Sequence, residues 1–367
     1  MNEYKTEEVE KAIQDAINET TAPNIFICGQ SGVGKSSLIN FIFKEDVAQT
    51  CDKEPCTKEI DYYKSQSINI YDSEGYEIGS EKQDRYEKLI FTDFLDKKNG
   101  LDKEDVHLIW YAVSGAGKRF TDLDKKLINK MMAAKYPVAI LLTKIDELDE
   151  TQLDDMMKSI NSELPKIPVF RITTIDNKDV QEYCDITKLE TWSHEQLKPI
   201  YKERFVSGLK AGLAEKRKSA NVVIGLATAA AATAAASPIP FSDAAIITPI
   251  QAGMVVKIAS IYGLTAQSSS IVSLVSSLGI SNLGRTLAGN LLKIIPAIGS
   301  FAGGLINAGV ASALTAAIGK GLESICYENC EKHLSGLEPI FDIESILKSS
   351  QFTELVSTIF SKERKEA

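Results

Sequence analysis

The chain lacks an excess of positive charge. Its 367 residues include 41 lysines and arginines against 50 aspartates and glutamates, which gives a net charge of −9 at pH 7. A surface that binds nucleic-acid phosphates needs clustered lysine and arginine side chains. We therefore expect no nucleic acid among the partners of this protein.

A secretory signal is also missing from the start of the chain, which reads MNEYKTEEVEKAIQDAI and is polar and acidic. Six cysteines without such a signal indicate free thiols in a reducing compartment, so we expect a cytoplasmic protein. Residues 1–20 instead predict an amphipathic helix. Its apolar face would consist of Val9, Ala12, Ile13, Ala16 and Ile17.

Charge is nearly absent from residues 219–319, where only Asp243, Lys257, Arg285 and Lys293 carry it. This change in composition predicts one domain over residues 21–198 and a second, all-α domain over residues 199–367. The uncharged stretches are long enough to cross a bilayer, but alanine, glycine, serine and threonine predominate and would insert weakly. Small residues also let helices pack closely. The region therefore suits a tight helical bundle or a membrane-inserting hairpin, and we favour the compact helical domain.

Short apolar runs alternate with amphipathic stretches in the first domain. The runs that predict strands begin at Asn24, Asp61, Ser67, Val106, Pro137 and Ile167. Helical patterns lie between most of them, for example over residues 35–43, 84–95 and 122–135. This alternation predicts an α/β domain with a mainly parallel sheet covered on both faces. Ligands of such sheets bind at the carboxyl ends of the strands.

Residues 29–36 read GQSGVGKS and match the phosphate-loop spacing G-x-x-x-x-G-K-[ST]. Backbone N–H groups of such a loop surround phosphate oxygens, and its glycines permit that close approach. Lys35 would reach the β and γ phosphates, and the Ser36 hydroxyl would ligate Mg²⁺. The residues that we expect around the phosphates are Gly29, Gln30, Ser31, Gly32, Val33, Gly34, Lys35, Ser36 and Ser37.

Two further segments predict the groups that respond to the γ-phosphate. DSEG at residues 72–75 follows a predicted strand, so Asp72 would hold Mg²⁺ through a water and the Gly75 N–H would contact the γ-phosphate. Thr57 precedes another predicted strand and would be the second protein ligand of Mg²⁺, with Thr50 as the alternative. We therefore predict Lys35, Thr57 and Gly75 as catalytic residues, and Ser36 and Thr57 as metal ligands.

The segment TKID at residues 143–146 predicts which base is bound. A carboxylate at Asp146 can accept hydrogen bonds from the N1–H and the 2-amino group of guanine, whereas adenine offers neither donor. The alkyl chain of Lys144 would cover the base, and Thr143 would lie beside it. Thr173 or Thr174, after the last predicted strand, would support the base from the other side. GTP and GDP are therefore the expected ligands.

The ordered set GQSGVGKS, Thr57, DSEG, TKID and ITT resembles the translation-factor-related class of GTPases, on its Era-like and septin-like side, over about residues 21–195. The resemblance implies a GTP/GDP switch that uses Mg²⁺ and hydrolyses GTP. The run that begins at Ser237 resembles a domain of unknown function found in bacterial GTPases, for which membrane association is suggested. A helical domain formed by both chain ends is also similar in architecture to the immunity-related GTPases.

One position departs from the Ras-like pattern, because Tyr76 follows Gly75 where a water-orienting glutamine often stands. Tyrosine cannot position the attacking water in the same way, so we expect slow hydrolysis without a partner or dimerisation. Arg85 or Arg119 could supply the missing group, in cis or across a homodimer formed through the nucleotide face.

Three functions fit these patterns. In the first, which we favour, a GTPase switches the state of its C-terminal helical domain and thereby binds or releases a protein or membrane partner. In the second, GTP gates an effector that inserts into or remodels the inner face of the cell membrane. In the third, the chain binds nucleotide and hydrolyses it negligibly.

Overall fold

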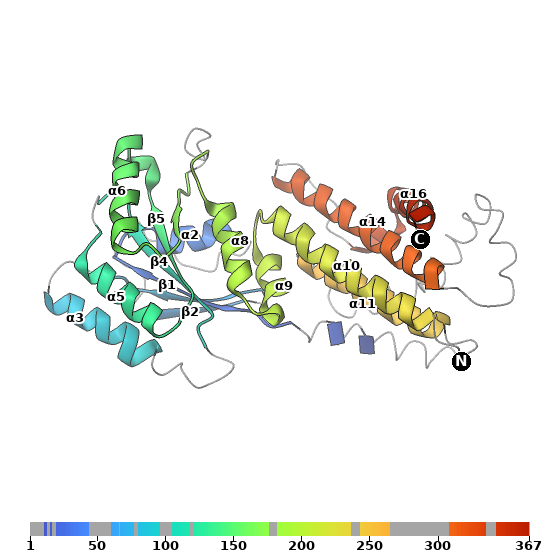
Figure 1. Ribbon diagram of the computed structural model, residues 1–367, viewed down its shortest axis with the longest axis horizontal. Helices are drawn as coiled ribbons and strands as arrows, with labels where there is room; N and C mark the ends of the chain where they lie inside the picture. Colours follow the sequence, from blue (N-terminus) through green and yellow to red (C-terminus); the bar gives the residue numbers. More distant parts are fainter. Residues whose placement is uncertain are drawn as a thin grey trace, which may run out of the picture. The chain divides into compact units, whose positions relative to one another are not determined.

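The computed structural model describes residues 11–12, 15–16, 20–43, 60–65, 67–76, 80–95, 105–117, 120–175, 182–235, 243–264, 308–334 and 343–366. The chain divides into two compact units, Thr21–Gly212 and a second unit made of Met1–Thr20 with Leu213–Ala367 (Figure 1). The first combines a sheet with helices, and the second is helical.

One six-stranded sheet forms the centre of the first unit. Its strands are β1(Asn24–Gly29), β2(Ile60–Lys64), β3(Asn69–Ser73), β4(Leu108–Ser114), β5(Val138–Thr143) and β6(Val169–Arg171), in the order β2-β3-β1-β4-β5-β6. Every neighbouring pair is parallel except β2 and β3. The α/β class with a mainly parallel sheet is therefore confirmed. Because the strands that pair with β1 in parallel, β3 and β4, lie on opposite sides of it, the loop after β1 lies where ligands of such sheets bind.

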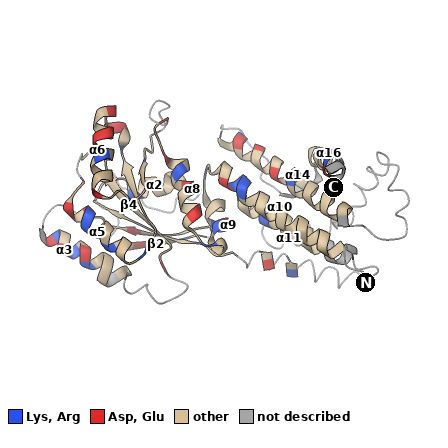
Figure 2. Ribbon diagram, in the orientation of Figure 1, with Lys and Arg blue, Asp and Glu red and all other residues tan. Residues whose placement is uncertain are grey.

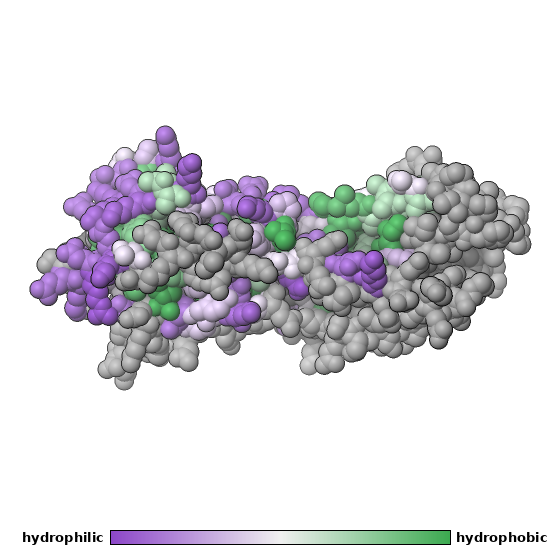
Figure 3. All heavy atoms as spheres, turned by 90° about the horizontal axis from the view of Figure 1, so that it is seen from below, coloured by the Kyte–Doolittle hydropathy of each residue, from purple (hydrophilic) through white to green (hydrophobic). Residues whose placement is uncertain are grey.

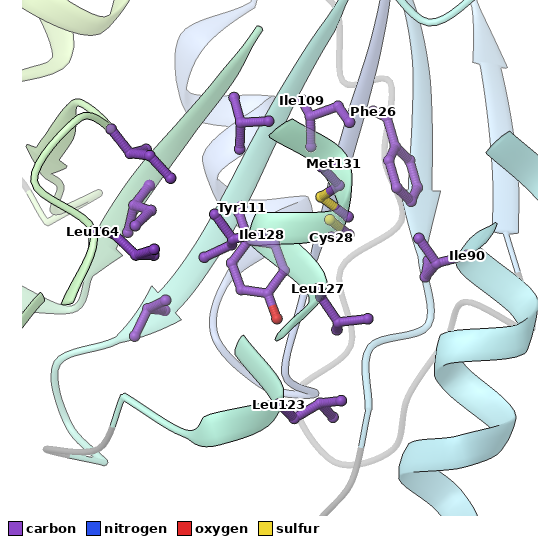
Figure 4. Packing of buried hydrophobic residues seen from close by; sticks show 14 of the residues in the cluster. Phe26, Cys28, Ile90, Ile109, Tyr111, Leu123, Leu127, Ile128, Met131 and Leu164 are labelled. Atoms are coloured by element: carbon purple, nitrogen blue, oxygen red, sulfur yellow. The ribbon is translucent and has the colours of Figure 1, made fainter. Parts of the chain in front are cut away.

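Helices cover both faces of this sheet because β4 carries large apolar side chains on alternate sides. Tyr111 joins a core built with α3(Ser80–Lys88), the π-helical segment η1(Leu89–Leu95), α5(Asp122–Ala133) and α6(Glu150–Glu163) (Figure 4). Trp110 points to the opposite face, where its ring stacks on Phe43 at 6.0 Å, just after α2(Lys35–Ile42). Its indole N–H donates to the Ser193 hydroxyl (3.1 Å) in α8(Ile186–Gln196).

The boundary between the units differs from the one expected after residue 198. Helix α9(Pro199–Gly208) belongs to the first unit, because the buried Phe205 ring contacts Phe43 edge-on at 6.2 Å. Leu209 is buried as well and pairs with Phe43 in an antiparallel bridge. The backbone N–H of Lys210 then donates to the carbonyl of Ile42 (2.8 Å). The loss of charge along the sequence begins only after these contacts, so composition could not locate the boundary at Gly212.

Small residues bring the helices of the second unit together. Its described helices are α10(Leu213–Ala235), α11(Asp243–Ile261), α14(Ala308–Leu334), α15(Ile343–Lys348) and α16(Ser350–Glu366). A Cβ at Gly319 would lie 2.7 Å from Ile224 and 2.9 Å from the sulfur of Met254, so only glycine allows α14 to approach α10 and α11 this closely. Figure 2 shows that α10 carries its charged residues at its first turns and is uncharged beyond them, as the sequence indicates. The prediction of a helical region after the sheet domain is confirmed.

A polar cluster around the buried Glu323 also links α10, α14 and Tyr262, the residue that follows α11. The carboxylate of Glu323 in α14 accepts hydrogen bonds from the Tyr262 hydroxyl (2.8 Å) and from Arg217 Nε in α10 (3.0 Å). The Arg217 guanidinium lies 3.6 Å from the centre of the Tyr327 ring. The buried carboxylate is therefore paired, which fixes how α10 and α14 are rotated against each other.

Four described residues of the N-terminal segment, Lys11, Ala12, Asp15 and Ala16, are helical. Ala16 is buried whereas Lys11 and Asp15 are exposed, which follows the expected amphipathic pattern. Within the ranges that the structure describes, no helix combines the length and the hydropathy needed to cross a bilayer.

The packing of α9 gives a test of the revised boundary. We expect Phe205→Ala to lower the free energy of unfolding by about 3–5 kcal/mol, because it removes a fully buried ring from the first unit. Ile200→Ala in the same helix is the control, since Ile200 is 46% exposed and its loss should change stability by less than about 0.5 kcal/mol. Urea unfolding measures both variants, and equal midpoints would place α9 outside this unit.

Candidate functional site

The loop between β1 and α2 depends on glycine. Gly29, with a φ of 137°, ends β1 so close to β4 that a Cβ there would lie 2.1 Å from the carbonyl oxygen of Ala112. Gly32 and Gly34 have φ values of 74° and 92°, which favour glycine. No side chain caps α2 at Gly34, so the first N–H groups of the helix face the loop. A helix N-terminus of this kind attracts anions.

Lys35 is the cation of this loop. It is buried, and its ammonium donates a hydrogen bond to the backbone oxygen of Gln30 (3.2 Å). Burial lowers the pKa of Lys35, while the negative charges of Asp72 and Glu74 act in the opposite direction. An anion bound beside the ammonium would therefore favour its charged form.

Asp72 near the end of β3 faces the start of α2. The Ser36 hydroxyl donates to Asp72 Oδ2 (2.7 Å), while Oδ1 is buried and accepts no hydrogen bond from the described part of the chain. Burial raises the pKa of Asp72, and Lys35 and Ser36 oppose that rise. A hydroxyl beside a carboxylate with an unpaired oxygen is a donor set that fits Mg²⁺, because this ion prefers oxygen ligands.

Gly75 completes this group from the segment after β3. Its φ is 82°, and a Cβ there would lie 2.7 Å from both Lys35 Nζ and the backbone nitrogen of Ser31. Lys35, Ser36, Asp72 and Gly75 therefore meet at one edge of the sheet. Thr57, Thr50 and Arg119 lie outside the described residues.

The end of β5 is tied to the same loop. Thr143 is buried, and its hydroxyl donates to the backbone oxygen of Val33 (2.7 Å), so its side chain connects two segments of the chain. Asp146 Oδ1 accepts a hydrogen bond from the Thr173 hydroxyl (2.6 Å), which itself accepts one from the Ile175 N–H (3.1 Å). Lys144 lies between them with a φ of 55°. These bonds fix the direction of the Asp146 carboxylate.

A pocket of about 170 Å³ opens between these segments. Its lining residues are Val33, Gly34, Ser37, Leu38, Thr143, Lys144, Asp146, Glu147, Ile172, Thr173, Thr174 and Ile175. Sequence reasoning named eight of them and missed Leu38, Glu147, Ile172 and Ile175. Three of the missed residues are apolar, and nothing in a motif distinguishes an apolar side chain that lines a pocket from one that packs in a core.

Tyr76 does not lie where a residue that orients water would be needed. Its side chain is buried, and its hydroxyl donates to Asp124 Oδ1 (2.7 Å) and lies 3.1 Å from the Thr121 hydroxyl at the start of α5. The pKa of Tyr76 is raised far above its usual value, and burial is the largest cause. Sequence reasoning missed these partners, although Thr121 and Asp124 have the spacing of a capping box. Arg85 is exposed on α3.

Comparisons with known proteins match the two parts of the chain separately. Residues 24–144 match the family described as 50S ribosome-binding GTPase, and residues 203–343 match a domain of unknown function, DUF697. A protein named probable GTP-binding protein EngB from Wolbachia pipientis wMel is 30% identical over 162 residues, which cover 41% of this chain and 78% of the relative. A protein of the same name from Mycoplasmopsis pulmonis (strain UAB CTIP) is 29% identical over 161 residues, which cover 42% of this chain and 83% of the relative.

Among solved structures, a crystal structure of a probable GTP-binding protein engB is 17% identical with a TM-score of 0.37, and covers 47% of this chain and 97% of that one. Together, the phosphate loop, the sheet and the sequence relatives show the identity of the first unit. The chain belongs to the P-loop GTPases of the EngB type, which bind and hydrolyse GTP, and it carries a C-terminal DUF697 region.

Proposed function

We propose that this GTPase is a Mg²⁺-dependent GTP/GDP switch that controls its C-terminal helical region. The observation that carries the proposal is the convergence of three segments at one edge of the sheet. The loop after β1 presents Lys35 and backbone N–H groups, the end of β3 presents Asp72, and the segment after β5 presents Asp146. These groups would bind the triphosphate, the Mg²⁺ ion and the base, respectively.

The phosphates would lie over the N-terminus of α2. The N–H groups of Gly32 to Ser36 and the Lys35 ammonium would receive the β and γ phosphates, with Gly75 beside the γ-phosphate. Ser36 would ligate Mg²⁺ directly, Asp72 would hold it through a water, and Thr57 stays the predicted second ligand. When bound, Mg²⁺ neutralises the charge that develops between the β and γ phosphates.

The base would occupy the pocket beside Asp146. Thr173 donates to Oδ1 of this carboxylate and so fixes its plane, while further lone pairs can accept the N1–H and the 2-amino group of guanine. The alkyl chain of Lys144 would cover one face of the base, and Thr174 would lie at its edge. Adenine would leave the carboxylate without donors, which disfavours ATP.

Hydrolysis without a partner should be slow. The Tyr76 hydroxyl is engaged by Asp124 in the core, so it cannot orient the attacking water. A second molecule bound at the nucleotide face, either another copy of this chain or a protein partner, would have to provide that group. Arg85 is exposed and stays a candidate for this role across a homodimer.

The second candidate is an effector whose helical region acts on a membrane at the inner face of the cell. One observation favours it: α10 exposes Val222 and Leu226, which are 59% and 70% exposed. Gly225, Ala229 and Ala230 are exposed at neighbouring positions of the same helical face, which is free of charge. On the side of the molecule seen in Figure 3, hydrophobic residues gather on the helical unit.

Removing the loop cation tests the phosphate site. We expect Lys35→Ala to abolish detectable GTP hydrolysis and to weaken nucleotide binding strongly, because no other charge of the loop can replace the buried ammonium. Lys158→Ala, at an exposed position of α6, is the matched control. Calorimetry and phosphate release measure both variants, and GTP turnover retained by Lys35→Ala would contradict the assignment.

Replacing the base-reading carboxylate tests the specificity. Asp146→Asn presents an amide donor to the 2-amino group of guanine, so we expect GTP affinity to fall at least about 100-fold. Xanthosine triphosphate has a carbonyl oxygen at that position and should bind the variant better than GTP does. Glu147→Gln makes the same chemical change at a neighbouring pocket residue and should keep the preference for GTP. Unchanged purine selectivity in Asp146→Asn would refute the role of Asp146.

Vesicle flotation with GTP or GDP separates the two candidates for the helical region. If the membrane candidate is right, the protein floats with anionic vesicles in one nucleotide state, and Leu226→Glu abolishes flotation without changing GTP turnover. If the switch acts on a protein, pulldown depends on the nucleotide and flotation does not. Indifference of both measurements to the nucleotide would refute control of the helical region by GTP.

A further inference from the structure

Tyr76, directly after Gly75, is fixed at three points. Its carbonyl oxygen accepts a hydrogen bond from the Ser31 N–H (2.9 Å), and its own N–H donates to the carbonyl oxygen of Gly29 (3.3 Å). Its hydroxyl donates to Asp124 Oδ1 (2.7 Å). The first two bonds hold the backbone to the phosphate loop, and the third anchors the side chain in the core.

Asp124 is a rigid acceptor for this hydroxyl. It is buried in the first turn of α5, where its Oδ2 accepts hydrogen bonds from the N–H and the hydroxyl of Thr121, at 2.8 and 2.7 Å. The Thr121 hydroxyl accepts from the Asp124 N–H (3.2 Å) and so completes the capping box. Tyr111 donates to the same Oδ1 as Tyr76 does, at the same distance of 2.7 Å.

A second tyrosine fixes the other end of the segment. The hydroxyl of Tyr86 in α3 accepts a hydrogen bond from the Gly29 N–H (3.1 Å) and lies 2.9 Å from the Ser73 hydroxyl. The rings of Tyr76 and Tyr86 are 5.5 Å apart. The segment from Ser73 to Tyr76 is therefore held at both ends.

We propose that Tyr76 is a positioning residue for the γ-phosphate, and that its bond to Asp124 holds the Gly75 backbone beside Lys35. This inference rests on the proposed GTP site, because Gly75 would lie beside a γ-phosphate only if GTP binds at that site. The bond acts through the backbone, since the anchored side chain belongs to the residue next to Gly75. A phenylalanine would fill the same space and leave that backbone less constrained.

The geometry also explains why this position carries tyrosine instead of a residue that orients water. The side chain points into the core and does not reach the reacting atoms. It instead fixes the backbone that would contact the γ-phosphate. Discrimination between GTP and GDP then depends on a peptide that is already in place before binding, which reduces the entropy lost when the third phosphate binds. Tyr76 would thus affect the affinity for GTP much more than the affinity for GDP.

The chain offers a matched pair of variants. Tyr76→Phe and Tyr111→Phe each remove one hydroxyl from Asp124 Oδ1, but Tyr111 lies within β4 and not beside Gly75. We expect Tyr76→Phe to weaken a non-hydrolysable GTP analogue about tenfold while changing GDP affinity less than about twofold, as loss of a hydrogen bond to a charged group suggests. The affinity ratio should be unchanged in Tyr111→Phe.

Dissociation constants for both nucleotides, with kcat and KM for GTP, measure the effect in the full chain. A structural role alone would lower the thermal midpoint of both variants similarly and leave the GTP/GDP ratio untouched. The proposal is overturned if Tyr76→Phe has the same ratio of GTP to GDP affinity as the unmodified protein. It is also overturned if Tyr76→Phe and Tyr111→Phe change that ratio equally. If Tyr76→Phe fails to fold, Thr121→Val takes its place, because it removes one donor to Asp124 Oδ2. This variant must then lower the ratio of GTP to GDP affinity, and an unchanged ratio overturns the proposal as well.

The unmodified protein separates this inference from the function on which it rests. If it binds neither GTP nor GDP, the proposed GTP site is wrong. If it binds both and Tyr76→Phe leaves their ratio unchanged, the site stands and only the role of Tyr76 is refuted.

Discussion

The close approach of β1 to β4 at Gly29 is the constraint on which the rest of the site depends. With 2.1 Å between an added Cβ and the carbonyl oxygen of Ala112, no other residue permits this pairing. The pairing fixes where the loop leaves the sheet, and thus where α2 begins and where Lys35 and Ser36 lie. A parallel sheet then brings the ends of β3 and β5 to the same edge, so the three segments proposed to bind the nucleotide lie together.

Hydrogen bonds from side-chain hydroxyls connect the segments around the site to one another and to the core. Thr143 donates to Val33 in the phosphate loop, Thr173 donates to Asp146, and Tyr76 donates to Asp124. In each pair a hydroxyl connects two segments that are distant along the chain. The groups assigned to ligand binding therefore have defined directions before nucleotide binds, which reduces the cost of ordering them. The unpaired oxygen of Asp72 is an exception, and it lies where the cation is expected.

Much of the first unit could be predicted because its signals are local. The apolar runs predicted all six strands, and spacing alone located the phosphate loop, DSEG and TKID. The domain boundary could not be predicted in this way, because Phe205 and Leu209 belong to the sheet domain through contacts with Phe43, far away in the sequence. The same reason explains Tyr76, whose neighbours in sequence suggest catalysis while its partners in space lie in α5.

The sequence by itself determined which groups this protein offers: a glycine loop with the phosphate-binding spacing, the carboxylate that we propose binds guanine, and a helical region made of small uncharged residues. Those properties depend on residue type and short spacing, which folding does not alter. The tertiary structure decided which hydroxyls support which carboxylates, where the first unit ends, and that the tyrosine after Gly75 faces the core. Such pairings join residues that are distant along the chain, so only packing in three dimensions brings them within hydrogen-bond distance.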